Sequence, residues 1–200
     1  MEIVQAITEA ADELRSPIIL QCSSGARKYA KHAYLVHLVK AALEETNIPI
    51  ALHLDHGGDF EICKQCIDGG FTSVMIDGSS LSYEDNIKET RRAVEYCHFY
   101  GVPVEAELGA LQGKEEDIVN ECDCKTDPKL VADFVERSGC DLLAVSIGNV
   151  HGLEMTPKID LPLLKELSAV CPVPMVMHGG SGVDFSLIRQ MKNYGMLKVN

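Results

Sequence analysis

Seven short apolar runs recur along the chain, each bounded by turn-forming residues and separated from the next by a segment with helical periodicity. The runs are apolar on both faces, as parallel strands that are covered on both sides must be. We expect strands at 16–23, 48–56, 72–79, 102–109, 141–148, 173–180 and 196–200, and helices at 1–15, 28–46, 59–69, 83–100, 128–138, 160–170 and 184–194. This alternation predicts an α/β fold around a parallel sheet.

The number of repeats favours a (β/α)8 TIM barrel over an open doubly wound sheet, because no Gly-x-Gly-x-x-Gly fingerprint follows the first run. A complete barrel has eight strands, and this chain, taken as one domain over residues 1–200, supplies seven. We therefore expect an incomplete barrel that lacks strand 1 and the segment after strand 8. Its two open sheet edges predict pairing with another chain, as a homodimer or a higher homo-oligomer.

Charge and hydropathy exclude several classes of protein. The 18 Lys and Arg residues are scattered in a chain of net charge −12, so the basic patch of a nucleic-acid-binding protein is absent. No apolar run reaches the ~18 residues of a membrane span, and the N-terminal pattern is that of an amphipathic helix rather than a signal peptide. We expect a cytoplasmic protein with no nucleic-acid or membrane partner, whose anionic ligands are held by backbone amides, helix N-termini or a metal.

Two features lie outside the regular pattern. The acidic segment 110–127 lacks a clear apolar period and follows a strand, where barrel enzymes keep mobile active-site loops. Cys63-x-x-Cys66 and Cys122-x-Cys124 could together hold zinc, but one pair falls in a predicted helix and the other in this loop. In a chain without a secretory signal we expect reduced, mostly buried thiols instead.

Polar residues gather at the carboxyl ends of the predicted strands, where barrel active sites form. His56, His151 and His178 come from three different strand ends. Zinc accepts imidazole nitrogens readily, and catalytic zinc keeps three protein ligands and one open position. A hydrogen-bonded structural histidine is the alternative for each residue alone, and the better interpretation of His53. Three histidines at equivalent positions indicate a metal centre.

A glycine-rich run, His178-Gly-Gly-Ser-Gly-Val-Asp, leads from a strand into a helix. Glycines let the backbone approach an anion, and the amides at a helix start, with the Ser181 hydroxyl, can bind phosphate. Barrel enzymes commonly build phosphate sites after strands 7 and 8. An ordinary glycine-rich turn is the alternative.

These motifs, in this order, resemble the class II fructose-bisphosphate aldolase family over essentially the whole chain. The matching pieces are HLDH (53–56), MIDGS (75–79), VEAELG (104–109), GKEED (113–117), SIGNVHG (146–152), MHGGSG (177–182) and KVN (198–200). The resemblance implies that His56, His151 and His178 bind a catalytic zinc ion. It also implies that Asp55 acts as acid and base on the C4 hydroxyl of the ketose, and that Glu115 moves protons at C3 of dihydroxyacetone phosphate.

The resemblance assigns further positions to cations and substrate. Asp77 and Glu107 resemble residues at an alternative or second divalent metal position. The positions similar to substrate or phosphate contacts, some of which also bind a monovalent cation in the family, are Ser23, Gly152, Gly179, Ser181 and Asn200.

The implied reaction is reversible cleavage of a ketose 1,6-bisphosphate, first of all fructose 1,6-bisphosphate, to dihydroxyacetone phosphate and glyceraldehyde 3-phosphate, as in glycolysis. A divalent metal can stabilise the charge that develops on the ketone oxygen, and no Lys lies at the end of strands 2 to 7 to form a Schiff base. Tagatose 1,6-bisphosphate and further phosphoketoses stay open as substrates. Two different kinds of protein, a barrel hydrolase and a truncated, non-catalytic metal-binding relative, also stay open.

Overall fold

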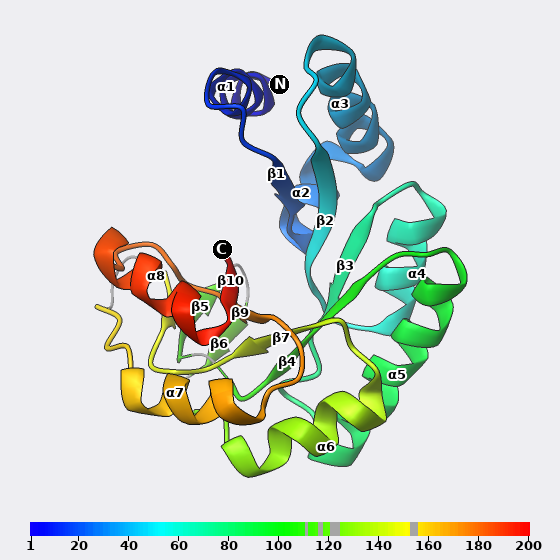
Figure 1. Cartoon of the computed structure of the whole chain (residues 1–200). Coiled ribbons are helices and arrows are strands. Elements are labelled where there is room, and N and C mark those ends of the chain that lie inside the picture. Colours follow the sequence, from blue (N-terminus) through cyan, green and yellow to red (C-terminus); the bar gives the residue numbers. More distant parts are fainter. Residues whose placement is uncertain (111, 116–117, 121–124, 153–155) are drawn as a thin grey trace.

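A curled parallel sheet of seven strands organises the computed structural model of the chain (Figure 1). The structure describes residues 1–110, 112–115, 118–120, 125–152 and 156–200, with the backbone alone for 112–115 and 118–120. The strands lie side by side in chain order: β1 (Ile18–Cys22), β2 (Ile50–Gly57), β3 (Ser73–Ile76), β4 (Val104–Leu108), β7 (Leu142–Val145), β9 (Met175–Met177) and β10 (Met196–Val199). Six of the predicted strand ranges contain one of these strands completely, and β2 extends one residue beyond its predicted range of 48–56.

Helices cover the convex outer face of this sheet (Figure 1). They are α1 (Glu2–Glu13), α2 (Ser24–Ala30), α3 (His32–Glu45), α4 (Phe60–Asp68), α5 (Tyr83–Phe99), α6 (Pro128–Ser138), α7 (Leu161–Val170) and α8 (Phe185–Met191), the last followed by a 3-10 turn at Lys192–Tyr194. The predicted single helix at 28–46 was wrong. Two helices occupy this region because Lys31, between them, has a φ of 61°, which α-helical backbone does not accommodate.

Alternation along the strands divides the side chains between two faces. In β4, Val104, Ala106 and Leu108 belong to the large apolar core between sheet and helices. Glu105 and Glu107 lie between them in sequence, are buried, and therefore face the inside of the curl. A small separate apolar cluster that includes Met75, Ala144 and Val176 fills part of this interior.

The edge strands β1 and β10 flank the opening of the curl. In the described part of the chain the strand order starts at β1 and ends at β10, without a pairing between them. A cavity of about 590 Å³ is lined by residues of both strands, including Ile19 and Leu197. The architecture is an incomplete TIM barrel, as the sequence predicted.

The acidic segment after β4 contains regular structure that the sequence did not reveal. Strand β5 (Gln112–Glu115) pairs antiparallel with β6 (Ile118–Asn120) and parallel with β8 (Val150–His151). Strands of two to four residues are too short to show a period, and the pairing of β5 with β8 is a long-range contact. The lack of an apolar period in this segment therefore did not reveal these short strands. Among the described residues, none of the helices combines the length and apolar character needed to cross a bilayer.

Candidate metal centre and active site

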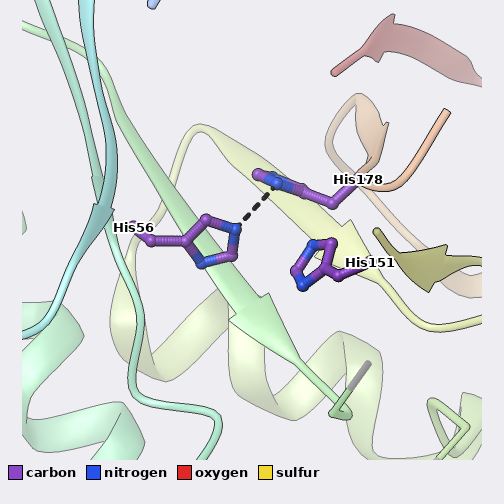
Figure 2. A group of neighbouring side chains, drawn as sticks. All are labelled: His56, His151 and His178. Carbon is purple, nitrogen blue, oxygen red and sulfur yellow. Dashed lines mark hydrogen bonds between the residues drawn. The ribbon is translucent and has the colours of Figure 1, made fainter. Parts of the chain in front are cut away.

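Three imidazoles meet at the carboxyl ends of the strands. His56 in β2, His151 in β8 and His178 directly after β9 point toward one another (Figure 2). One nitrogen from each ring lies within 4.8 Å of the others. Tetrahedral zinc with bonds of ~2.1 Å holds its ligand nitrogens about 3.4 Å apart. The predicted triad is therefore assembled at a spacing close to that of a metal site.

His53, Asp55 and His56 all face the interior, and the backbone at His56 explains how they can. Strict alternation would place 53, 55 and 57 on one face and His56 on the other. The register between β2 and β3 shifts between Leu54 and Gly57, and His56 has a φ of 45°. A non-glycine residue in this left-handed region is strained, and such strain concentrates at functional sites. The irregularity turns the His56 ring toward the other two imidazoles.

Two carboxylates, the half-buried Asp77 and the fully buried Glu105, fix the orientation of two rings. His56 Nδ1 lies 2.8 Å from Asp77 Oδ2, and His178 Nε2 lies 2.7 Å from Glu105 Oε1. An ionised carboxylate only accepts, so these two ring nitrogens are the donors. In the neutral rings the remaining nitrogens, His56 Nε2 and His178 Nδ1, then carry lone pairs, and they lie 3.0 Å apart. Two facing lone pairs repel unless a cation lies beside both, so this donor set fits a divalent metal.

Burial and local charge keep the site in the form that a metal requires. Burial, with the neighbouring His56 and His178, lowers the pKa of His151 to about 4. Burial raises the pKa of Asp77, but the hydrogen bonds from His56 and Ser79 outweigh it and lower the value to about 2. At neutral pH His151 is therefore uncharged, as a metal ligand must be, and Asp77 is an ionised acceptor.

The second predicted cation position also has its residues together. One ligand atom each from His56, Asp77 and Glu107 lies within 4.8 Å of the others. Glu107 is buried, and its Oε2 is 3.8 Å from His56 Nδ1. His56 therefore belongs to both groups, so a metal could be held by either set of ligands.

Asp55 and Asn200 lie beside the triad. Asp55 Oδ1 is 3.8 Å from His178 Nδ1 and accepts a hydrogen bond of 3.3 Å from the Asn200 amide. The backbone N–H of Asn200 donates to Met177 O, which holds the end of β10 against β9. A carboxyl group and an amide thus lie next to the imidazole nitrogens.

The glycine-rich run makes a close backbone crossing rather than a direct helix start. Gly179 has a φ of 66°, and a Cβ there would lie 2.0 Å from Val150 O. Helix α8 begins later, at Phe185, and the Asp184 carboxylate accepts from the Ser186 amide at its first turn. Ser181 is exposed in the turn before that helix.

The other predicted substrate positions are less informative. Gly152 follows His151 and has a φ of 85°. Ser23 follows β1 and accepts from the Ala26 amide as the N-cap of α2. For Glu115 the structure gives the backbone of β5, and its side chain lies outside the described residues.

The possibility of a cysteine zinc site gains no support. Cys63 and Cys66 are buried in α4, where burial raises the pKa of Cys66 to about 12. Neither thiol belongs to a group of three potential metal ligands in the described part of the chain. Cys122 and Cys124 lie outside the described residues.

Sequence reasoning gave no role to three residues that support the triad. Glu105 holds His178, and Lys198 in turn holds Glu105 at 2.7 Å. Asn149, fully buried, donates to His178 O and accepts from the Ile147 amide, which ties the loop after β7 to β9. Glu105 could have been found, because it stands two residues before Glu107 in a strand and must share its face.

Fold and site together define a barrel enzyme with a candidate three-histidine metal centre. The model of the family "Fructose-bisphosphate aldolase class-II" matches residues 1–200. Fructose-bisphosphate aldolases of Staphylococcus epidermidis and Geobacillus stearothermophilus are each 43% identical over 100% of this chain and 71% of their own length. The chain belongs to the class II fructose-bisphosphate aldolase family, and it is a lyase that acts on ketose bisphosphates.

Solved structures agree with this assignment. The YdjI aldolase of Escherichia coli K12 superimposes with a TM-score of 0.88 at 33% identity, over 100% of this chain and 71% of that one. A fructose-1,6-biphosphate aldolase of Coccidioides immitis, described as putative, gives 0.87 at 33% identity, over 98% of this chain and 71% of that one.

Proposed function

We propose that this aldolase binds zinc through His56, His151 and His178 and reversibly cleaves fructose 1,6-bisphosphate to dihydroxyacetone phosphate and glyceraldehyde 3-phosphate. The observation that carries the proposal is the convergence of three imidazole nitrogens within 4.8 Å at the strand ends. A divalent ion bound there supplies a Lewis acid for the ketone oxygen, which takes on negative charge as the C3–C4 bond breaks.

The remaining chemistry is proton transfer by protein side chains. Asp55 takes the proton from the C4 hydroxyl during cleavage and returns it during condensation. Its position supports this role, because the Asn200 amide donates to the Asp55 carboxylate and holds it 3.8 Å from His178 Nδ1, next to the centre. Glu115 delivers a proton to C3 of the dihydroxyacetone phosphate product. The attachment of β5 to β8, next to His151, brings the backbone of Glu115 to this side of the site.

Phosphate binding falls to the glycine turns. Gly152 and Gly179 directly follow candidate metal ligands and have positive φ values of 85° and 66°. Residues with a side chain rarely adopt this conformation, so the backbone amides of these glycines can point in directions that other residues do not allow. Ser181 and Ser23 add hydroxyl groups at the same mouth, and Asn200 contacts the substrate directly. A monovalent cation next to the phosphate, and a second divalent position at Asp77 and Glu107, complete the proposed ion set.

Fructose 1,6-bisphosphate is proposed because relatives from Staphylococcus and Geobacillus are named for it. Tagatose 1,6-bisphosphate differs only in configuration at C4, so the contacts around Asp55 decide between them. With fructose 1,6-bisphosphate as substrate, the enzyme serves glycolysis in the cytoplasm. We also propose a homo-oligomer, because among the described residues no strand pairs with the outer edge of β1 or of β10.

A coupled assay tests the function. Triose phosphate release from a panel of ketose bisphosphates is followed before and after removal of metal by a chelator, and again after zinc is added back. We expect cleavage of fructose 1,6-bisphosphate that is lost with the metal and restored by zinc. Turnover that is indifferent to the chelator would refute the proposed metal centre, and preference for the tagatose isomer would refute the proposed substrate.

Asp55→Asn separates the acid–base role from metal binding. The amide keeps the shape of the side chain but cannot take a proton, so cleavage should fall by about 10²–10⁴-fold while zinc stays bound. Asp133→Asn, in an exposed ion pair with Arg137, is the matched control and should keep normal activity. Normal turnover in Asp55→Asn would remove Asp55 from the role.

A further inference from the structure

A chain of buried polar side chains crosses the barrel interior beneath the candidate metal centre. Glu105 and His53 are at most 1% exposed, and Lys198 is 9% exposed. Lys198 Nζ lies 2.7 Å from Glu105 Oε2 and 3.2 Å from His53 Nε2. His53 Nδ1 reaches Ser73 Oγ at 2.8 Å. The chain connects β10, β4, β2 and β3, and it contacts the centre through Glu105 and His178.

Donor and acceptor matching allows one arrangement of protons along this chain. The Lys198 ammonium has only donors, so Glu105 Oε2 and His53 Nε2 must both accept from it. The His53 proton is then on Nδ1 and is donated to Ser73 Oγ. The other carboxylate oxygen, Glu105 Oε1, accepts from His178 Nε2 at 2.7 Å. In the neutral ring His178 is left with an unprotonated Nδ1, the nitrogen that faces His56 and that can accept from the Asn200 amide at 3.1 Å.

We propose that Glu105 and Lys198 are positioning residues for His178, Lys198 by fixing the orientation of the Glu105 side chain, and Glu105 by holding the His178 ring with Nδ1 directed into the centre. The inference rests on the proposed metal function of His178. It goes beyond it because the proposed function gives neither Glu105 nor Lys198 a role. A buried residue with only a packing role would not need a particular pattern of donors and acceptors.

Glu105→Gln reverses the pattern at His178. The amide NH2 group cannot face the Lys198 ammonium, because two donors would meet there. The amide oxygen therefore turns to Lys198 and the NH2 group to His178 Nε2, which must now accept. The His178 proton moves to Nδ1, the nitrogen needed by the metal. Zinc affinity should fall about 10–100-fold, as for the loss of other residues that orient metal ligands.

The double variant Glu105→Gln, Lys198→Met distinguishes positioning from packing. Without the ammonium, the Gln amide can turn its oxygen back to His178 and its NH2 group toward His53 Nε2, which is 3.7 Å from the oxygen it replaces. Zinc affinity should then recover about tenfold relative to Glu105→Gln alone. Lys198→Met by itself keeps the carboxylate and should leave the His178 proton on Nε2. If Glu105 and Lys198 only packed the interior, the losses of zinc affinity in the two single variants would add in the double variant.

The measurements need no catalytic turnover. Zinc dissociation constants come from competition with a chromophoric chelator. The protonated nitrogen of His178 comes from ring ¹⁵N chemical shifts of metal-free, ¹⁵N-histidine-labelled protein, assigned with His178→Ala. Melting curves establish that each variant is folded, and Glu61→Gln, in an exposed pair with Arg92, is the matched control.

We expect a proton on His178 Nδ1 in Glu105→Gln and on Nε2 in the wild type and in the double variant. A wild-type ring pattern in Glu105→Gln, or a double variant as weak as Glu105→Gln, would overturn the proposal. Should His178→Ala bind zinc as tightly as the wild type, the metal centre itself would be wrong. The ring shifts of the metal-free protein would still decide whether Glu105 positions His178.

Discussion

Gly179→Ala tests whether the backbone crossing at the end of β9 sets the geometry of the metal centre. Gly179 follows His178, and the atom it would strike, Val150 O, belongs to the residue before His151. The added Cβ would lie 2.0 Å from that oxygen and 2.7 Å from the Val150 carbonyl carbon. Both neighbours are backbone, so they cannot move aside as a flexible side chain would. The substitution therefore pushes two candidate metal ligands apart.

The expected effects follow from these distances. The two backbones must separate by about 1 Å or more to restore van der Waals contact, and a 1 Å displacement in an active site can reduce activity ~10²-fold. Left-handed backbone at φ 66° adds about 1–2 kcal/mol, and overpacking adds about 1–3 kcal/mol. We expect zinc affinity and cleavage to fall together by about 10²-fold, and the melting temperature to fall by roughly 4–20 °C.

Gly101→Ala is the matched control for backbone strain. Gly101 follows α5 with a φ of 70°, and a Cβ there would meet nothing within 4 Å. It carries the same left-handed penalty without the collision, so stability should fall by about 1–2 kcal/mol while activity and zinc affinity stay unchanged. Chelator competition, the coupled assay and thermal unfolding are measured on both variants. If Gly179→Ala matched Gly101→Ala in zinc affinity, the reasoning would be refuted.

Three further predictions concern the charged groups and thiols. Asp77→Asn weakens the hydrogen bond that orients His56 and should reduce zinc affinity about 10–100-fold in chelator competition, and unchanged affinity would contradict that role. Burial raises the pKa values of Asp77 and Glu105, but their hydrogen bonds, and for Glu105 also the Lys198 ammonium, lower both to about 2. Their contribution to stability is therefore present above about pH 4.5 and is lost as the pH falls toward 2. Urea titrations of the metal-free protein measure this. A free energy of unfolding that did not change below about pH 4.5 would argue against it. Burial raises the pKa values of Cys63 and Cys66, so both should resist alkylation in the native protein and react after unfolding, as mass spectrometry of labelled peptides can measure.

The sheet could be predicted because its signal is local and repeated. Each strand of the seven-stranded sheet is a mostly apolar run of three to eight residues between turn residues, and parallel strands buried on both faces keep this pattern along the chain. The break at Lys31 could not be predicted, because one residue with a positive φ leaves no trace in an otherwise helical period. The small sheet of β5, β6 and β8 depends on pairing across the fold.

The metal-ligand candidates could be predicted from topology alone. The carboxyl ends of parallel strands meet at one mouth, so histidines at three strand ends must approach one another. The apolar pattern that predicts the strands does not indicate which nitrogen of each histidine ring faces the centre, or which residue orients the ring. Those features depend on the backbone irregularity at His56 and on the partners of each ring, Asp77 and Glu105.

Outward residues of each strand stabilise the fold, and inward residues support the active site. Outward residues of β4 such as Val104 and Ala106 join the apolar core, and burial of apolar surface stabilises the fold by about 25 cal/mol per Å². Inward residues such as Glu105 are buried polar groups, whose desolvation opposes folding unless partners compensate. Lys198 and His178 are those partners. Because a neighbouring residue in the same strand faces the opposite layer, the barrel can hold an ionic chain under its active site while the outer layer keeps the sheet together.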